Sequence, residues 1–222
     1  MDKARIIEVK KNVLGDNDQQ AQALREELRQ KRTFMLNLMS SPGSGKTTAV
    51  LRTIAMLQDS LKIGVIEADI DSSVDADRIL AAGFPAVQLR TNGLCHLDAR
   101  MTREGVAALG EFDLDMIILE NIGNLICPAE YDTGASKNVM ILSVPEGDDK
   151  PLKYPIMFSA CDALLISKID VLDHFNFDFA AVEARVRKLN PGMAVFGISA
   201  KTGQGIDAWT DWLHSQVRQW IQ

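Results

Sequence analysis

The chain has 222 residues, enough for one α/β domain with a substantial core. Its 46% apolar and 24% charged residues are usual for a globular protein, and its net charge of −6 argues against non-specific binding to nucleic acid or to a membrane surface. No apolar run approaches the roughly 18–20 residues of a membrane span and residues 1–11 lack a signal-peptide core, so we expect a cytoplasmic protein.

The first predicted element is a polar helix over residues 16–32 with a narrow apolar stripe. We expect residues 1–32 to form an N-terminal segment and helix, and residues 33–222 to form the domain itself. Apolar strands are predicted over residues 33–39, 62–68, 86–89, 114–120, 139–144, 163–167 and 193–198. Helices are predicted over residues 46–58, 74–82, 97–109, 152–160, 179–189 and 205–220. This alternation predicts a doubly wound, mostly parallel α/β sheet with helices on both faces.

A glycine-rich segment with the sequence SSPGSGKTT, residues 40–48, joins the first strand to the following helix. Apart from Ser40 at the first position, it matches the pattern G-x-x-x-x-G-K-[ST] of a phosphate-binding loop. Backbone N–H groups of such a loop point at phosphate oxygens, and the helix N-terminus favours the anion. We predict that Lys46 contacts the β- and γ-phosphates and that Thr47 binds Mg²⁺. The other phosphate-binding candidates are Ser41, Gly43, Ser44, Gly45 and Thr48.

Acidic residues at two strand ends are candidates for the Mg²⁺ site and for catalysis. Glu120 begins Glu-Asn-Ile-Gly, which resembles the D-x-x-G element of guanine-nucleotide domains and ends at Gly123, the candidate γ-phosphate sensor. Asp69, just past the second strand, is the candidate Mg²⁺-linked acid of the first switch; Asp71, Asp75 and Asp77 are neighbouring alternatives that could simply favour a helix N-terminus. We assign catalytic roles to Lys46, Asp69 and Glu120, and Mg²⁺ ligation to Thr47, Asp69, Asp75 and Glu120.

Two further segments indicate guanine specificity. Ser167-Lys168-Ile169-Asp170 resembles N-K-x-D, in which the carboxylate of Asp170 would accept hydrogen bonds from guanine N1–H and N2–H. Adenine offers no such donor pair, so this contact selects GTP. Lys168 would lie over the base, and Ser167 in place of Asn is expected to weaken or remove one polar contact. The sequence Ser199-Ala200-Lys201 resembles the S-A-K loop, which meets guanine O6.

The predicted enzyme is a slow GTPase. Asn124 follows Gly123 at the position where faster GTPases use a water-orienting glutamine, and no arginine finger supplied in cis is evident. We expect an unassisted turnover of about 10⁻⁴ to 10⁻² s⁻¹. A kinase-like P-loop transferase is a further alternative, which would not select guanine.

The cysteines suggest a second site. Three cysteines in a chain of this kind do not form a disulfide framework, so metal ligands, a nucleophile or buried thiols remain open. Cys95 and His96 are adjacent at a predicted helix start, and Cys127 lies four residues after Gly123. Thiolate and imidazole suit Zn²⁺ and Ni²⁺. Cys161, His174 and His214 are predicted to be structural or surface residues.

The segments SSPGSGKTT (40–48), GLCHLDA (93–99) and ENIGNLICPA (120–129) are similar to those of the HypB family, the nickel-incorporation GTPases of [NiFe]-hydrogenase maturation. The resemblance implies a SIMIBI-class P-loop GTPase that forms a homodimer with GTP. It implies a metallochaperone with a Ni²⁺ or Zn²⁺ site at the dimer interface, made by Cys95, His96 and Cys127 within an insert of the domain.

The same resemblance implies a maturation partner such as HypA and a hydrogenase large-subunit precursor. The sequence lacks the N-terminal Cys-rich nickel motif and the His-rich tract of some family members, so a second high-affinity nickel site is not expected. We also expect GTP to move Gly123 and Cys127 and thereby change metal affinity. The alternatives are a urease-type nickel-insertion GTPase and a regulatory GTPase without metal function.

Overall fold

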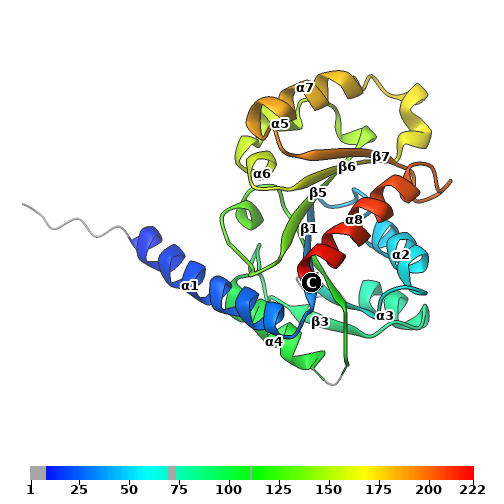
Figure 1. Ribbon diagram of the computed structural model, residues 1–222. Helices are drawn as coiled ribbons and strands as arrows, with labels where there is room; N and C mark the ends of the chain where they lie inside the picture. Colours follow the sequence, from blue (N-terminus) through cyan, green and yellow to red (C-terminus); the bar gives the residue numbers. More distant parts are fainter. Residues whose placement is uncertain (1–8, 70–73, 111) are drawn as a thin grey trace, which may run out of the picture.

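Seven parallel strands form one sheet in the order β3-β2-β4-β1-β5-β6-β7 (Figure 1). The structure is a computed structural model that describes residues 9–69, 74–110 and 112–222, with side chains from residue 14 onward. The strands are β1 (Phe34–Ser40), β2 (Ile63–Asp69), β3 (Ala86–Arg90), β4 (Met116–Gly123), β5 (Lys137–Ser143), β6 (Ala163–Ser167) and β7 (Ala194–Ile198). From β1 the chain forms β2 and β3 on one side, returns to place β4 between β2 and β1, and then adds β5, β6 and β7 on the other side, which confirms the predicted doubly wound sheet.

Helices separate most of the strands, as predicted, with three local differences, of which the first is that α1 begins at Val9 and not near residue 16. The helices are α1 (Val9–Gln30), α2 (Lys46–Leu57), α3 (Val74–Ala81), α4 (Ala99–Ala108), α5 (Lys150–Lys153), α6 (Pro155–Ser159), α7 (Phe179–Leu189) and α8 (Ile206–Ile221), and the 3₁₀ turns are η1 (Cys127–Ala129), η2 (Val144–Glu146) and η3 (Ile169–His174). The predicted helix over 152–160 is two short helices, because Pro155 disfavours helical backbone at Tyr154. Helix α4 begins only at Ala99, because Asp98 caps it by accepting from Met101 N at 2.7 Å.

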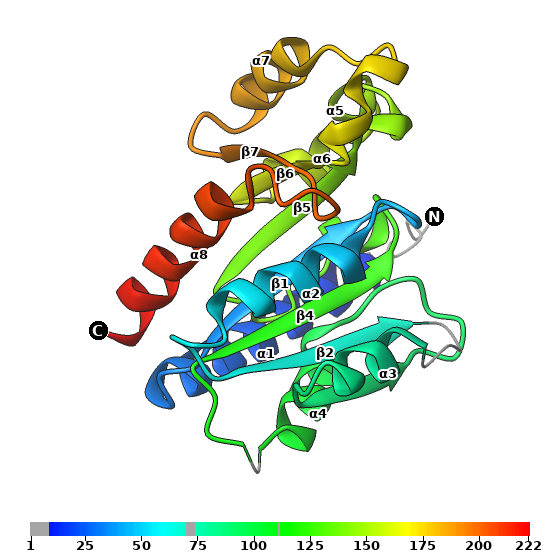
Figure 2. The same ribbon diagram turned by 90° about the vertical axis from the view of Figure 1, so that its right-hand side faces the viewer.

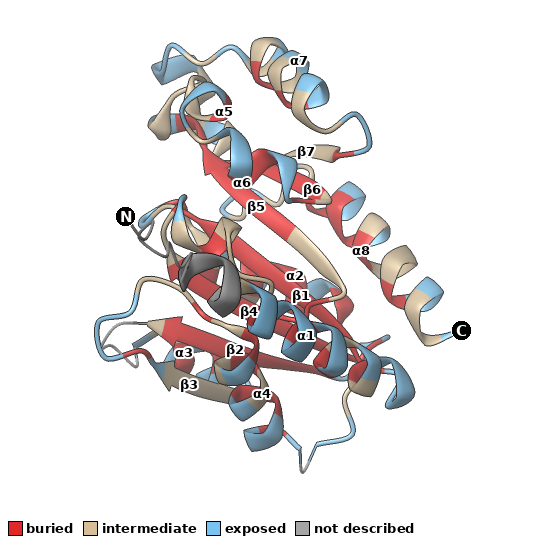
Figure 3. Ribbon diagram, turned by 90° about the vertical axis from the view of Figure 1, so that its left-hand side faces the viewer, coloured by how far each residue is buried: buried red, intermediate tan, exposed pale blue. Residues whose placement is uncertain are grey.

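Both faces of the sheet are covered, as the continuously apolar strands predict. Side chains of β1 alternate: Phe34, Leu36 and Leu38 pack with α2, α3 and α8, whereas Met35 and Met39 point to the opposite face. That second face lies behind the sheet in Figure 2, where α2, α3 and α8 are in front, and it carries α1 and α4 over one half and α6 and α7 over the other. The buried strands lie between helices whose outer sides are exposed (Figure 3). Among the described residues, no helix combines the length and apolarity needed to cross a membrane.

Helix α1 packs along α4 on the second face (Figure 1). The predicted apolar stripe of Ala21, Leu24 and Leu28 is fully buried. Leu24 and Leu28 join a cluster with Met35 of β1 and Val106 of α4. The helix therefore contributes to the core of the domain and is not merely laid on its surface.

Candidate functional site

The glycine-rich segment forms the connection between β1 and α2. Gly43 and Gly45 have φ angles of 75° and 94°, a left-handed conformation that side chains with a Cβ rarely adopt. Ser40, which stands in place of the first glycine of the motif, accepts hydrogen bonds from Ser44 Oγ at 2.6 Å and from Lys46 Nζ at 3.0 Å. The serine hydroxyl therefore orients the lysine across the loop.

Two buried glutamates lie beside this loop. Glu67 and Glu120 are paired in register on β2 and β4, and Thr47 Oγ1 donates to Glu120 Oε1 at 2.8 Å. One carboxylate oxygen from each of Glu67, Asp75 and Glu120 lies within 4.8 Å of the others. Within the described part of the chain, Glu67 Oε2 and Glu120 Oε2 have no hydrogen-bond partner.

These carboxyl groups are electrostatically unusual. Burial, and then the charge of Glu120, raise the pKa of Glu67 to about 10. Burial also raises the pKa of Glu120, although the charge of Lys46 and the hydrogen bond from Thr47 oppose this shift. Buried acids with too few donors fit a divalent cation, since hard cations prefer carboxylate oxygens.

The carboxylates open into a cavity of about 420 Å³. Lys46, Thr47, Asp69, Asp75 and Gly123 line it, together with Glu67, Glu120, Thr48 and Arg78. The guanidinium of Arg78 is bound to Asp75 at 3.1 Å. Asp71 lies outside the described residues. Glu67 was not predicted from the sequence as a site residue, although an acid directly after the apolar residues 63–66 of a predicted strand was a usable signal.

A second cavity, of about 340 Å³, adjoins the phosphate loop on the other side. It is lined by Lys168, Asp170, Ala200 and Lys201, together with Ser44, Gly45, Thr48, Ala49, Ser167, Val171 and Ile198. Ser199 Oγ donates to Asp170 Oδ1 at 2.6 Å, and this hydrogen bond lowers the pKa of Asp170. The Asp170 carboxylate is therefore ionised at neutral pH and can act as a hydrogen-bond acceptor at the wall of this cavity.

Two residues that line this second cavity, Ser167 and Lys168, also bind the phosphate loop. Ser167 Oγ donates to the carbonyl of Ser44 at 2.8 Å, and Lys168 Nζ donates to the carbonyl of Gly43 at 2.7 Å. Ser167 thus makes a polar contact with the phosphate loop through its hydroxyl group. At the start of the loop, Ser41 Oγ donates a hydrogen bond to the carboxylate of Glu146 in η2.

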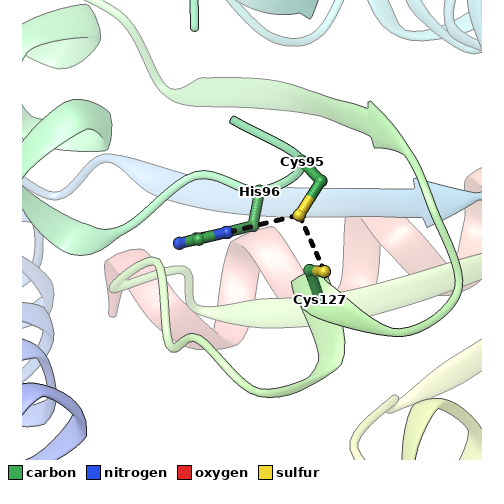
Figure 4. A group of neighbouring side chains, drawn as sticks. All are labelled: Cys95, His96 and Cys127. Atoms are coloured by element: carbon green, nitrogen blue, oxygen red, sulfur yellow. Dashed lines mark hydrogen bonds between the residues drawn. The ribbon is translucent and has the colours of Figure 1, made fainter. Parts of the chain in front are cut away.

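The predicted metal ligands come from two loops (Figure 4). Cys95 and His96 lie between β3 and α4, and Cys127 begins η1 just after β4. The two Sγ atoms are 2.8 Å apart, and Cys95 Sγ lies 3.9 Å from His96 Nδ1. Both thiols are free, and all three side chains are half-buried. This set of soft and borderline donors suits Ni²⁺ or Zn²⁺.

The surroundings of these ligands shape their chemistry. Burial lowers the pKa of His96, which favours the neutral imidazole that binds metals. The hydrogen bond with Cys95 raises the pKa of Cys127. The ring of His96 stacks on Tyr131 with centroids 3.8 Å apart and an interplanar angle of 17°. Tyr131 was not singled out from the sequence, in which only its place four residues after Cys127 marks it.

A direct backbone contact connects the two sites. A Cβ on Gly123 would lie 2.9 Å from Pro42 N and 3.1 Å from Pro42 Cα. Strand β4 therefore ends against the phosphate loop, and Cys127 follows four residues later. Between them, the Asn124 amide donates to the carbonyl of Cys95 at 3.5 Å and accepts from Ile126 N at 2.8 Å. By contrast, Cys161 is buried in the core between β6 and α7.

Comparison with known proteins agrees with this arrangement. Residues 34–197 match the family described as CobW/HypB/UreG, nucleotide-binding domain. Hydrogenase maturation factor HypB of Azotobacter vinelandii is 44% identical over 97% of this chain and 71% of its own length. The chain belongs to the HypB family. HypB of Escherichia coli (strain K12) is also 44% identical, over 97% of this chain and 74% of its own length.

Solved HypB structures have the same fold. The crystal structure of HypB from Helicobacter pylori in complex with nickel is 40% identical, has a TM-score of 0.88, and is matched over 93% of this chain and 97% of that one. HypB from Archaeoglobus fulgidus is 35% identical with a TM-score of 0.85, over 92% of this chain and 100% of that one. The resemblance to the HypB family inferred from the motifs is therefore confirmed.

Proposed function

We propose that this HypB-family chain is a GTP-hydrolysing metallochaperone that assists nickel insertion into a hydrogenase precursor. The observation that carries the proposal is that Cys95, His96 and Cys127 converge close to the phosphate loop. Strand β4 contacts this loop at Gly123 and leads directly to Cys127. The nickel complex of the Helicobacter pylori relative supports nickel as the cargo. A urease-type assignment is less well supported, because that family uses a Cys-Pro-His triplet whereas this chain has Cys127-Pro128-Ala129.

The proposed nucleotide site uses both cavities. Lys168 and Asp170, which is bound by Ser199, select the guanine base; Ala200 and Lys201 line the cavity for that base, and Gly123 senses the γ-phosphate. Lys46 and the loop residues Ser41, Gly43, Ser44, Gly45 and Thr48 hold the phosphates. Thr47, Asp69, Asp75 and Glu120 would hold Mg²⁺, with Glu67 as an additional acid, and the unpartnered oxygens of the two glutamates fit that role. When bound, Mg²⁺ neutralises charge on the phosphates.

The proposed hydrolysis is slow without a partner. The Asn124 amide is engaged by Cys95 and Ile126, and the guanidinium of Arg78 is paired with Asp75. Both side chains are therefore already engaged by other groups of the chain. We propose an unassisted turnover between about 10⁻⁴ and 10⁻² s⁻¹.

The proposed assembly is a GTP-dependent homodimer that places the metal at its interface. Leu94 and Ile126 flank the cysteines, with 45% and 59% of their surfaces exposed. Apolar groups at these positions favour burial against a second subunit, whose thiolates could complete the coordination. A maturation partner such as HypA and the hydrogenase precursor are the proposed donor and recipient.

Metal binding to cysteine variants tests the proposal. We expect the wild-type chain to bind Ni²⁺ or Zn²⁺ stoichiometrically and the double variant Cys95→Ala/Cys127→Ala to lose that metal. Cys161→Ala is the matched control, because this thiol is buried in the core away from the other two. Metal content that is equal in the wild type and the double variant would instead favour a regulatory GTPase without metal function.

A further inference from the structure

The two loops that carry the proposed metal ligands both attach to helix α1, through one buried side chain. Asn17 is only 7% exposed. Its Oδ1 accepts from Ala99 N at 2.9 Å, and its Nδ2 donates to the carbonyl of Asp132 at 2.9 Å. Ala99 is the first residue of α4, just after the loop of Cys95 and His96, and Asp132 follows η1, which begins at Cys127.

The loop after Cys127 is held against α1 by more than this one bond. Arg25 donates to both carboxylate oxygens of Asp132 at 2.6 and 2.7 Å, and its Nε donates to the carbonyl of Ala135 at 2.9 Å. Gly134 has a φ of 80°, and a Cβ there would lie 2.9 Å from the carbonyl of Ala21. The loop therefore lies directly on the helix backbone, with no room for a larger side chain.

The loop before α4 is fixed to the same helix. Ala99 N is one of the amide groups at a helix start that lack a partner within their own helix, and Asn17 supplies one. Farther along, Arg103 of α4 forms an ion pair with Glu27 of α1. Because Asp98 caps α4 and closely follows His96, fixing the start of α4 also fixes the backbone that carries Cys95 and His96.

We infer that Asn17 is a positioning residue of the metal centre and that α1 is the support on which its two ligand loops are brought into register. This inference rests on the proposed metal-binding function. Asn17 binds Asp132, the residue after Tyr131, and Ala99, three residues after His96. The rings of Tyr131 and His96 stack on each other close to these two attachment points. Groups that hydrogen-bond metal ligands typically change metal affinity by about 10- to 100-fold when they are removed, and Asn17 acts on these ligands through the backbone of their loops.

Two variants of Asn17 test this role. Asn17→Ala removes both hydrogen bonds. Asn17→Asp keeps the shape and the acceptor for Ala99 N, but places a carboxylate oxygen against the carbonyl of Asp132, so it releases one loop only. Gln19→Ala is the matched control, because Gln19 is an exposed residue of the same helix.

Three measurements are made on each full-length variant. The first is Ni²⁺ affinity, by competition with a chromophoric chelator, together with the thiolate-to-nickel charge-transfer absorption. The second is GDP affinity, which reports on the fold and on the nucleotide site. The third is made without metal and is the equilibrium constant of thiol–disulfide exchange. In this reaction Cys95 and Cys127 are oxidised to a disulfide, and one glutathione disulfide is reduced to two glutathione thiols. This constant measures how closely the two loops are held.

We expect both Asn17 variants to bind Ni²⁺ at least about tenfold more weakly, with an altered charge-transfer band and a disulfide equilibrium shifted toward the thiols. The GDP affinity of both Asn17 variants should equal that of the wild type. The Gln19→Ala protein should match the wild type in all three measurements. Unchanged Ni²⁺ affinity and an unchanged thiol equilibrium in a folded Asn17→Asp protein would overturn the inference. If the wild type binds no Ni²⁺ through its cysteines, the proposed function fails, and the thiol equilibrium alone still decides whether Asn17 holds the two loops together.

Discussion

The pKa values of two carboxyl groups, those of Asp170 and Glu67, are shifted in opposite directions because their surroundings differ. Asp170 receives a hydrogen bond from Ser199, and its pKa is lowered, so it is a ready acceptor. Glu67 is buried beside a second acid, and its pKa is raised to about 10, so it is protonated at neutral pH. The first environment suits recognition of neutral N–H donors, and the second suits a cation that replaces the proton.

Asp170→Asn is expected to change nucleotide preference. The carboxylate can accept from both N1–H and N2–H of guanine, whereas an amide offers one acceptor and one donor. Xanthine carries a carbonyl where guanine has its amino group, so the amide suits xanthine better. We expect GTP affinity to fall at least about 100-fold and xanthosine triphosphate to bind in its place.

Competition of the two triphosphates against a fluorescent nucleotide measures this preference. Asp173→Asn, an exposed change in the same 3₁₀ turn, is the control and should leave it unaltered. Equal binding of GTP and ATP by the wild-type chain would contradict the role of Asp170 and favour a kinase-like transferase.

Glu67→Gln is expected to stabilise the metal-free protein at alkaline pH. The folded-state pKa of about 10 lies above the ordinary value of 4.5, so this group contributes stability below pH 4.5 that is lost as pH rises toward 10. The loss is at most about 1.4 kcal/mol per pH unit. Glutamine cannot ionise, so the variant should lose up to about 3 kcal/mol less than the wild type between about pH 6 and pH 8.

Urea unfolding with a chelator present, at a series of pH values, measures this difference. Glu104→Gln, an exposed glutamate on α4, is the control. Parallel stability curves for the wild type and Glu67→Gln would show that Glu67 ionises normally in the folded chain.

At the scale of elements, the sequence was sufficient wherever the signal was local. The seven apolar strands and the helices between them follow from periodicity, and the phosphate loop and Asp170 follow from short motifs. Features that depend on pairing between distant segments were not predictable. Glu67 gains its character from Glu120 on the neighbouring strand, and Asn17 gains its role from contacts with two loops much later in the chain.

Gly123→Ala is expected to disturb both sites through strand β4. The added Cβ would lie 2.9 Å from Pro42 N, closer than such atoms approach, so either the phosphate loop or the end of β4 must move. We expect affinity for GDP and GTP to fall by about tenfold or more, and Ni²⁺ affinity to change as well.

Calorimetric titration of nucleotide and of Ni²⁺ into each variant tests this link. Gly192→Ala is the matched control, because a Cβ there meets nothing closer than Asn190 Oδ1 at 3.6 Å. An alanine at Gly123 that weakens nucleotide binding alone would place the metal loop outside the influence of β4.

At the scale of the whole molecule, both sites lie at the carboxyl edge of a single sheet. Parallel strands bring their carboxyl ends together, so the connections after β1, β2, β3 and β4 meet at that edge. Strand β4 runs between β1, which leads into the phosphate loop, and β2, which carries Glu67. A shift at the end of β4 would therefore reach both the phosphate loop and the loop of Cys127.

This layout leads to a prediction about the intact protein: nucleotide and metal should influence each other's binding. GTP would engage Gly123 through its γ-phosphate, whereas GDP would not, so the two nucleotides should hold the loop of Cys127 differently. Because coupling free energies are reciprocal, a nucleotide that changes Ni²⁺ affinity by a given factor must have its own affinity changed by the same factor. We expect metal affinity to differ by a factor of about 5 to 100 between the GDP complex and the complex with a non-hydrolysable GTP analogue, in titrations of Ni²⁺ and of Zn²⁺.

Light scattering in the same samples should show dimers with the GTP analogue and monomers with GDP. Equal metal affinities with both nucleotides would remove the coupling while leaving the metal site itself intact.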